Sequence, residues 1–276
     1  MKKLIYTTDY SSNSIAALKY TASLGRSLNS DIIVLHVYSP EEEKGLRTPA
    51  ERKAVRERHQ KRLEEFCKDH LKEDFVRTEL SYAAIKGANV AEAIADFIRD
   101  MSVYLVIMGA SKTSTLKEVF LSSTSKEVTS ALTFPILAVP ADHEPGAIKK
   151  VLFASVFNDE DIHHLGQLVQ VLAFLKPAIE VVHVTHKAAE PAREALENFK
   201  NQLIKRVSYP HISCRSIYSE DVYGTIKETI QNEKPDVLVI PDSKERNEVD
   251  RLVIREKIKG VQTSTGVPVM CFPPAH

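Results

Sequence analysis

The sequence contains an internal repeat, which limits the chain to folds that can be built twice in tandem. Residues 2–8 read KKLIYTT and residues 149–155 read KKVLFAS, so the two segments match at an offset of 147 residues. Residues 35–37 (LHV) match residues 182–184 (VHV) at the same offset. Because two separate segments match in one register, we predict two similar domains in the chain.

The register of the repeat changes further along the chain. Residues 105–108 (LVIM) match residues 237–240 (VLVI) at an offset of 132, and residues 134–140 match residues 267–273 at an offset of 133. The second copy is therefore about fifteen residues shorter (147 minus 132) between its second and fourth strands. The polar segment 41–47 has little counterpart in the second copy, so we place the extra residues there.

Each copy alternates short apolar runs with segments of helical periodicity. In the first copy the pattern predicts strands at 3–8, 32–38, 76–82, 103–108 and 136–139 and helices at 14–28, 48–71, 89–101 and 123–132. In the second copy it predicts strands at 151–154, 179–185, 213–218, 237–240 and 267–272 and helices at 159–175, 190–207, 222–233 and 253–263. Right-handed crossovers convert this alternation into a parallel sheet covered on both faces.

The predicted fold class is therefore α/β, with two tandem Rossmann-like domains. Each domain has a five-stranded parallel sheet with helices on both faces. We place the first domain at residues 1–141 and the second at 148–276. The segment between them, 142–147 (DHEPGA), is polar and contains Pro and Gly, which is typical of a linker.

Charge and hydropathy exclude several classes of protein. The 37 Lys and Arg residues balance the 37 Asp and Glu residues, so net charge does not favour a nucleic-acid partner. No apolar run approaches the roughly 18 residues that span a bilayer, which predicts no membrane segment. The apolar start of the chain is interrupted by Thr7, Thr8 and Asp9 before it reaches the length of an export signal, so we expect a cytoplasmic protein.

The Cys and His residues do not form a metal or redox motif. The three cysteines are Cys67, Cys214 and Cys271. They are too widely separated for a Cys-x-x-Cys pair, and we expect reduced thiols. His183 and His186 lie three apart at the end of the predicted strand 179–185, and residues three apart on a strand point to opposite faces. His163 and His164 have no matching Cys or carboxylate spacing. We therefore expect both pairs to be solvent-exposed rather than metal-bound.

Candidate ligand-binding residues follow the predicted strands of the first copy. In an open α/β sheet a ligand binds at the carboxyl ends of the strands, where the strand order reverses. Asp9 follows the first strand, Val37 lies at the end of the second and Gly109 follows the fourth. The Asp9 carboxylate is suited to accept hydrogen bonds from an adenine or a ribose. The alternative interpretation is that Asp9, Ser11 or Ser12 caps the helix that follows.

The segment that begins at Gly109 has two interpretations. Residues 109–125 read GASKTSTLKEVFLSSTS, a strand ending in glycine that is followed by hydroxyl residues and a predicted helix. Unpaired backbone amides at such a helix start can bind an anion. Alternatively, Thr124 with Glu127 three residues later has the spacing of a capping box.

In these features the chain resembles a tandem universal stress protein over nearly its whole length. After the fourth strand the family pattern is glycine, two residues, glycine, nine residues, glycine, and then Ser or Thr. Gly109 matches the first glycine and Ser123 the final hydroxyl residue, whereas Lys112 and Ser122 replace the other two glycines. The resemblance implies an adenine nucleotide alpha hydrolase-like fold and a site for ATP, with magnesium. The resemblance assigns Asp9, Val37, Gly109 and Ser123 to this site. We add Ser111, Lys112 and Ser122 of the same segment as candidate nucleotide-binding residues.

The second copy departs further from the family pattern. Val156 stands at the position of Asp9, and Pro241 follows the fourth strand where the first copy has Gly109. The whole chain has only nine glycines, about half of average usage at roughly 7%. We therefore expect nucleotide binding in the first domain only and a degenerate second domain. In the first domain, the Lys112 ammonium offers a phosphate contact in place of the missing glycine.

The sequence supports two hypotheses for function. The first is a stress-response protein without enzymatic activity, or with slow ATP hydrolysis at most, whose first domain binds adenine nucleotide. The alternative is a nucleotide-free interaction scaffold that acts through an unidentified protein partner. The resemblance also implies that the two domains pair through the final strands, 136–139 and 267–272, and that the chain forms a homodimer.

Overall fold

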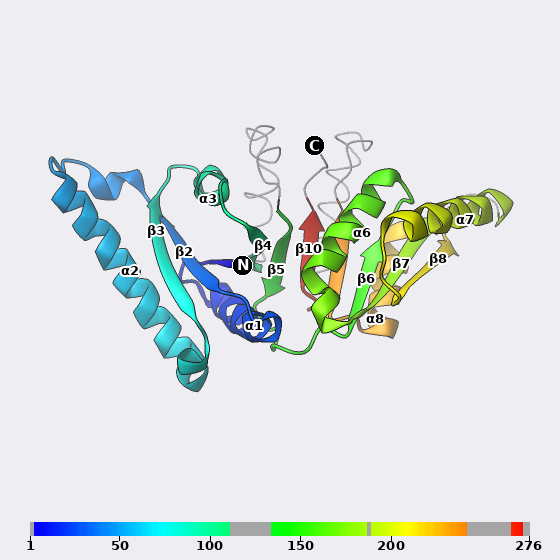
Figure 1. Cartoon of the computed structure of the whole chain (residues 1–276), viewed down its shortest axis with the longest axis horizontal. Coiled ribbons are helices and arrows are strands. Elements are labelled where there is room, and N and C mark those ends of the chain that lie inside the picture. Colours follow the sequence, from blue (N-terminus) through cyan, green and yellow to red (C-terminus); the bar gives the residue numbers. More distant parts are fainter. Residues whose placement is uncertain (1–2, 111–133, 187–188, 242–265, 273–276) are drawn as a thin grey trace. The chain divides into compact units, whose positions relative to one another are not determined.

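The chain divides into two compact units, Met1–Pro145 and Gly146–His276, in the computed structural model (Figure 1). The division lies between Pro145 and Gly146, within the polar segment 142–147. The structure describes residues 3–110, 134–186, 189–241 and 266–272. The helices expected at 123–132 and 253–263 lie outside these residues.

The first unit contains a five-stranded parallel sheet in the order β3-β2-β1-β4-β5. Its strands are β1 (Lys3–Thr7), β2 (Ile32–Tyr38), β3 (Leu80–Lys86), β4 (Val103–Ala110) and β5 (Ile136–Pro140). Its helices are α1 (Ser12–Leu28), α2 (Pro49–Leu71) and α3 (Val90–Ile98), with the short 3₁₀ helices η1 (Pro40–Glu43) and η2 (Lys72–Arg77). This topology confirms the predicted parallel α/β domain.

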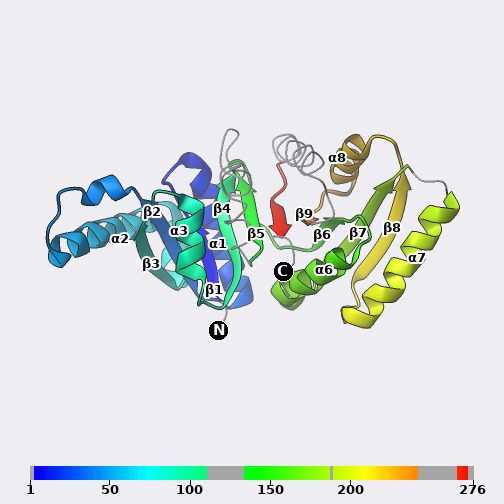
Figure 2. The same ribbon diagram turned by 90° about the horizontal axis from the view of Figure 1, so that it is seen from above.

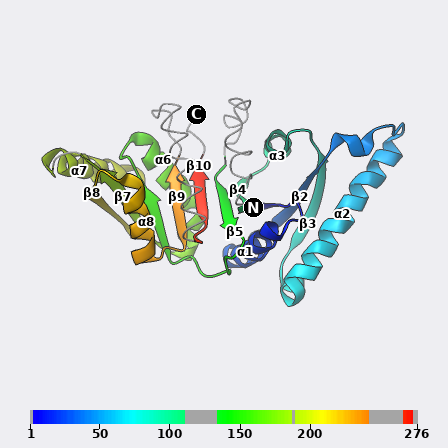
Figure 3. The same ribbon diagram turned by 180° about the vertical axis from the view of Figure 1, so that it is seen from behind.

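Helices cover both faces of the first sheet. Successive residues of a strand point to opposite faces, so the apolar strands give the sheet two apolar faces to bury. Ile5 packs in an apolar cluster with Ile94 and Ile98 of α3. Its neighbour Tyr6 points to the other face, where its hydroxyl donates a hydrogen bond to the Ser14 carbonyl of α1 at 2.6 Å. The helix α2 lies on the edge strand β3, as Figure 3 shows.

The second unit repeats this architecture with the strand order β10-β9-β6-β7-β8. Its strands are β6 (Lys150–Ala154), β7 (Ala178–Thr185), β8 (Ile212–Tyr218), β9 (Val237–Pro241) and β10 (Val269–Phe272). Its helices are α6 (Asp159–Leu172), α7 (Ala189–Arg206) and α8 (Val222–Glu233), with the 3₁₀ helix η3 (Ala173–Leu175). Figure 2 shows α8 on one side of β7 and β8, and α7 on the other.

The structure corrects one predicted strand and locates the difference in length between the copies. We expected the third strand at 76–82, but β3 is Leu80–Lys86 because residues up to Arg77 form η2, and Val76 is 88% exposed. Ten residues, 39–48, connect β2 to α2, whereas three residues, 186–188, connect β7 to α7. The extra residues of the first copy therefore include the predicted segment 41–47, part of which folds as η1.

A candidate ligand pocket in the first unit

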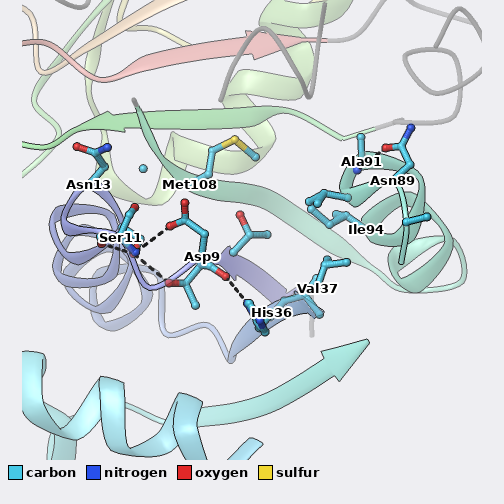
Figure 4. A pocket seen from close by; sticks show the side chains of 16 residues that line it. Asp9, Ser11, Asn13, His36, Val37, Asn89, Ala91, Ile94 and Met108 are labelled. Carbon is cyan, nitrogen blue, oxygen red and sulfur yellow. Dashed lines mark hydrogen bonds between the residues drawn. The ribbon is translucent and has the colours of Figure 1, made fainter. Parts of the chain in front are cut away.

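A pocket with a volume of about 430 Å³ lies at the carboxyl ends of β1, β2 and β4 (Figure 4). Its lining comprises Thr7, Thr8, Asp9, Ser11, Asn13, Ser14, Leu35, His36, Val37, Ala88, Asn89, Val90, Ala91, Ile94, Met108 and Gly109. The strand order reverses at this point, because β1 lies between β2 and β4 while the chain continues from β1 to β2. Such reversal points are the usual ligand sites of open α/β sheets.

Three predicted site residues lie together in this pocket. Asp9 comes from the turn after β1, Val37 from the end of β2 and Gly109 from the end of β4. Figure 4 shows Asp9 and Val37 beside the same cavity. The other predicted site residues, Ser111, Lys112, Ser122 and Ser123, lie outside the described residues, as does the alternative capping pair Thr124 and Glu127.

Asp9 closes the turn before α1 and presents an exposed carboxylate to the pocket. Its Oδ1 accepts a hydrogen bond from the backbone N–H of Ser11 at 3.0 Å. Ser11 occupies the N-cap position of α1, but its side chain makes no capping hydrogen bond. Among the described residues, none donates to Asp9 Oδ2, so this oxygen is available to a ligand.

Gly109 is required by packing within the domain. A Cβ atom built at this position would lie 2.4 Å from the Asn13 carbonyl oxygen in the first turn of α1. Real Cβ atoms do not approach backbone atoms so closely, so a side chain would force α1 and β4 apart. The glycine that we interpreted as the start of a phosphate loop therefore also allows α1 to approach the end of β4.

Sequence reasoning missed the contribution of α3 to the pocket. Asn89 is the N-cap of α3, and its Oδ1 accepts hydrogen bonds from the N–H groups of Ala91 at 3.0 Å and Glu92 at 3.3 Å. Ile94, one turn further along, and Met108 of β4 supply apolar surface to the pocket. An Asn immediately before an apolar periodic run signals a helix start, but no local signal indicates which cavity that helix faces.

His36 lines the pocket, and its ring centroid lies 5.3 Å from that of His59 on α2. The carbonyl of Thr8 accepts a hydrogen bond from its Nδ1 at 2.8 Å, so this nitrogen carries the proton. Burial lowers the pKa of His36, and the nearby His59 and Arg62 add to this effect, against the opposing influence of the Thr8 carbonyl and Glu42. The imidazole is therefore neutral near pH 7.

The lowered pKa of His36 predicts acid destabilisation of the first unit. Because the folded-state pKa lies below the unfolded value of 6.5, the unfolded chain binds more protons between these two values. Stability from this group is thus fully present above about pH 6.5 and is lost as pH falls through the folded-state pKa. Between pH 7.5 and 5.5 we expect the melting temperature to fall more for the natural chain than for His36→Asn, which keeps a donor for Thr8.

Thermal unfolding at several pH values checks this expectation, with His186→Asn as the control because His186 is an exposed histidine of the second unit. The control should show the same pH dependence as the natural chain. An unchanged pH dependence in His36→Asn would contradict the prediction.

The corresponding turn of the second unit is built around a buried carboxylate. Asp161 is 0% exposed. Its Oδ2 accepts hydrogen bonds from Ser155 Oγ at 2.6 Å and from the N–H groups of Val156 at 2.8 Å and Phe157 at 3.1 Å. Val156 stands at the repeat position of Asp9, so the second unit has a half-exposed apolar side chain where the first unit has a carboxylate.

The structure corrects part of the expectation for the histidine pairs. His163 and His186 are exposed, as predicted. His183 is only partly exposed, with its ring packed against Phe157, and His164 is fully buried, with its ring 5.3 Å from that of Phe272. The prediction of an exposed His164 was wrong because α6 turns this position toward β10. Within the described ranges, no group of three or more His, Cys, Asp or Glu side chains is arranged to hold a metal ion.

The three cysteines are free thiols, and no disulfide joins them. Burial raises the pKa of Cys67 to about 12 and that of Cys214 to about 11, so both thiols stay protonated at neutral pH.

In the part of the chain that the structure describes, no helix has the length and apolar character needed to cross a membrane.

Comparison with known proteins gives a match in sequence and several in structure. The sequence pattern of the Universal stress protein family matches residues 1–140, which is more than half of the 276 residues. No curated protein matches the sequence. The family match covers the pocket and all seven predicted site residues.

Solved structures show the same fold at low sequence identity. A universal stress protein from Archaeoglobus fulgidus DSM 4304 has a TM-score of 0.64 and 15% identity, over 98% of this chain and 95% of that one. A chain from Pseudomonas aeruginosa UCBPP-PA14 that is described as a universal stress protein has a TM-score of 0.58 and 15% identity, over 98% and 93%. The cytoplasmic domain of a prokaryotic cation chloride cotransporter has a TM-score of 0.54 and 9% identity, over 99% and 95%.

Proposed function

Since the chain belongs to the universal stress protein family, we propose that it is a stress-response protein whose first unit binds an adenine nucleotide. The observation that carries this proposal is the meeting of Asp9, Val37 and Gly109 around one pocket at the strand reversal. The pocket volume of about 430 Å³ lies within the range of roughly 300–1,000 Å³ that is typical of small-molecule sites.

The described lining suits the nucleoside part of such a ligand. Leu35, Ile94 and Met108 provide apolar surface for a purine ring, and Asp9 Oδ2 is placed to accept a hydrogen bond from a ribose hydroxyl or an adenine amino group. The described lining residues include no Lys or Arg. We therefore assign the phosphates of ATP, with magnesium, to the segment after Gly109.

In that segment Ser111, Ser122 and Ser123 would donate hydroxyl hydrogen bonds to the phosphates, and Lys112 would offer its ammonium. We propose binding in the first unit only, because in the second unit Val156 stands at the position of Asp9 and the Asp161 carboxylate is buried within the turn. On this proposal the protein acts by binding rather than by turnover.

Equilibrium titration with ATP, with and without magnesium, tests the proposal. We expect one equivalent to bind per chain. Asp9→Ala should weaken binding tenfold or more, because it removes a charged acceptor worth about 1.5–3 kcal/mol. The stability of the fold should change little, because Asp9 is exposed.

The matched control is Asp96→Ala, which removes an exposed carboxylate from α3 that does not line the pocket. It should bind ATP like the natural chain. Two equivalents per chain would contradict the restriction to the first unit. Absence of saturable binding would contradict the nucleotide proposal and favour the alternative, a nucleotide-free interaction scaffold. The replacement of two family glycines by Lys112 and Ser122 supports that alternative.

A further inference from the structure

The residue that follows Asp9 has an unusual backbone conformation. Tyr10 has a φ of 64°, in the left-handed region. Residues with a Cβ rarely adopt this conformation, and an aromatic residue has no side-chain group that would favour it locally. Contacts elsewhere in the domain must therefore hold Tyr10 in place.

The ring of Tyr10 is clamped on several sides by residues of β2 and α2. Its centroid lies 4.6 Å from that of His36 and 5.4 Å from that of Phe66. The guanidinium carbon of Arg62 lies over the ring at 4.1 Å from the centroid, a cation–π contact. Burial raises the pKa of Tyr10 to about 12, so the ring is uncharged and its hydroxyl stays protonated.

The conformation of Tyr10 determines where the Asp9 carboxylate points. The backbone N–H of Tyr10 donates to Thr8 Oγ1 at 2.9 Å, and the N–H of Ser11 donates to Asp9 Oδ1 at 3.0 Å. The second of these bonds spans Tyr10. A change of its φ to negative values would move the Ser11 N–H away from Asp9 and free the carboxylate to rotate.

The second unit contains the same turn without the carboxylate. Phe157 has a φ of 61°, and its ring centroid lies 4.7 Å from that of His183 and 4.6 Å from that of Phe199. His183 Nδ1 bonds to the Ser155 carbonyl at 2.9 Å, as His36 does to Thr8. Val156 precedes Phe157, so here the clamped ring has no acidic side chain to orient.

We propose that Tyr10 is a positioning residue for the pocket: its ring, clamped by His36, Arg62 and Phe66, holds the left-handed turn that aims Asp9 at the ligand. This inference rests on the proposed binding of an adenine nucleotide. Unit two supplies an internal comparison, because its Phe157 holds the same turn where there is no carboxylate.

Titration of the full-length chain with ATP tests the inference through a set of variants. Tyr10→Ala should weaken binding tenfold or more. Tyr10→Phe should bind within twofold of the natural chain, because the second unit uses Phe in this turn and the Tyr10 hydroxyl has no hydrogen-bond partner among the described residues. Phe157→Ala should lower the melting temperature of its own unit without changing ATP affinity.

A double-mutant cycle separates positioning from general destabilisation. If Tyr10 acts through Asp9, Tyr10→Ala should cause no further loss of affinity in an Asp9→Ala background, because the interaction is already gone. Additive losses would overturn the inference. So would unchanged binding by Tyr10→Ala, or a loss in Tyr10→Phe as large as that in Tyr10→Ala.

Amide hydrogen exchange at Ser11 in the ligand-free chain gives a second measurement. Its N–H should be protected in the natural chain and in Tyr10→Phe, and unprotected in Tyr10→Ala. If Tyr10→Ala does not fold, Arg62→Met removes one side of the clamp and should weaken binding about threefold and reduce Ser11 protection. If the natural chain binds no ATP, the proposed function fails, and Ser11 exchange still shows whether Tyr10 holds the turn.

Discussion

Replacing Gly109 with alanine is expected to lower the free energy of unfolding of the first unit by about 2–3 kcal/mol. The added Cβ would lie 2.4 Å from the Asn13 carbonyl oxygen and 2.8 Å from the Ser14 backbone nitrogen. Both atoms belong to the backbone of α1, so no side-chain rotation can relieve the overlap. The first turn of α1 would have to move away from β4, and the pocket between them would change shape.

Denaturant unfolding followed by hydrogen exchange in each unit measures this effect. Gly146→Ala is the matched control, because no atom lies within 4 Å of a Cβ built there and its backbone is not in the left-handed region. The control should be neutral to within about 0.5 kcal/mol. Equal stability of Gly109→Ala and the natural chain would show that α1 adjusts without strain. Packing against α1 would then not explain the glycine, and only its proposed part in ligand binding would remain.

Replacing Asp161 with alanine should destabilise the second unit by about 3 kcal/mol. The side chain is 0% exposed, and its Oδ2 accepts hydrogen bonds from Ser155 Oγ and from the backbone N–H of Val156. Its loss would leave a buried hydroxyl and a backbone N–H without this acceptor. Buried donors that lose a charged acceptor are among the costly defects in proteins.

The control for this prediction is Asp159→Ala in the same first turn of α6. Asp159 has a side-chain exposure of 69% and forms a surface ion pair with Arg206 at 3.3 Å. Asp159→Ala also removes a carboxylate near the N-terminus of α6, but an exposed one. The free energy of unfolding should therefore fall by only about 0.5–1 kcal/mol. Hydrogen exchange within β6 and α6 distinguishes the two variants, and equal losses would mean that burial of the Asp161 carboxylate contributes no stability of its own.

Local sequence patterns predicted most of the fold because the strands of both sheets are continuous apolar runs. Strand β2 was predicted with its observed ends, at residues 32–38, and helix α2 within one residue. The third strand was displaced because Val76 belongs to an apolar pattern in sequence but lies exposed on η2. Pairing with β2, through Leu35 and Ala83 among others, sets the register of β3, and that pairing joins segments far apart in the chain.

The candidate site was predicted only in part. Asp9 follows β1, and Val37 and Gly109 lie at the ends of β2 and β4, so the strand-end rule was sufficient to select them. Asn89 and Ile94 were missed because the position of α3 over the sheet depends on packing of its apolar face. Ser14 and Asp161 occupy equivalent positions of the repeat. Only the structure shows that each accepts hydrogen bonds from the turn before its helix, Ser14 from Thr8 in the first unit and Asp161 from Val156 in the second.

The sequence by itself determined that this chain builds one α/β domain twice, and it predicted a candidate ligand site where the strands of the first domain end. These features depend on periodicity along the chain and on the fixed handedness of crossovers, both of which are local. Only the tertiary structure decided why Gly109 must be glycine, how Tyr10 is held and that His164 is buried. Each of these depends on atoms from distant segments meeting at close range, which no local pattern encodes.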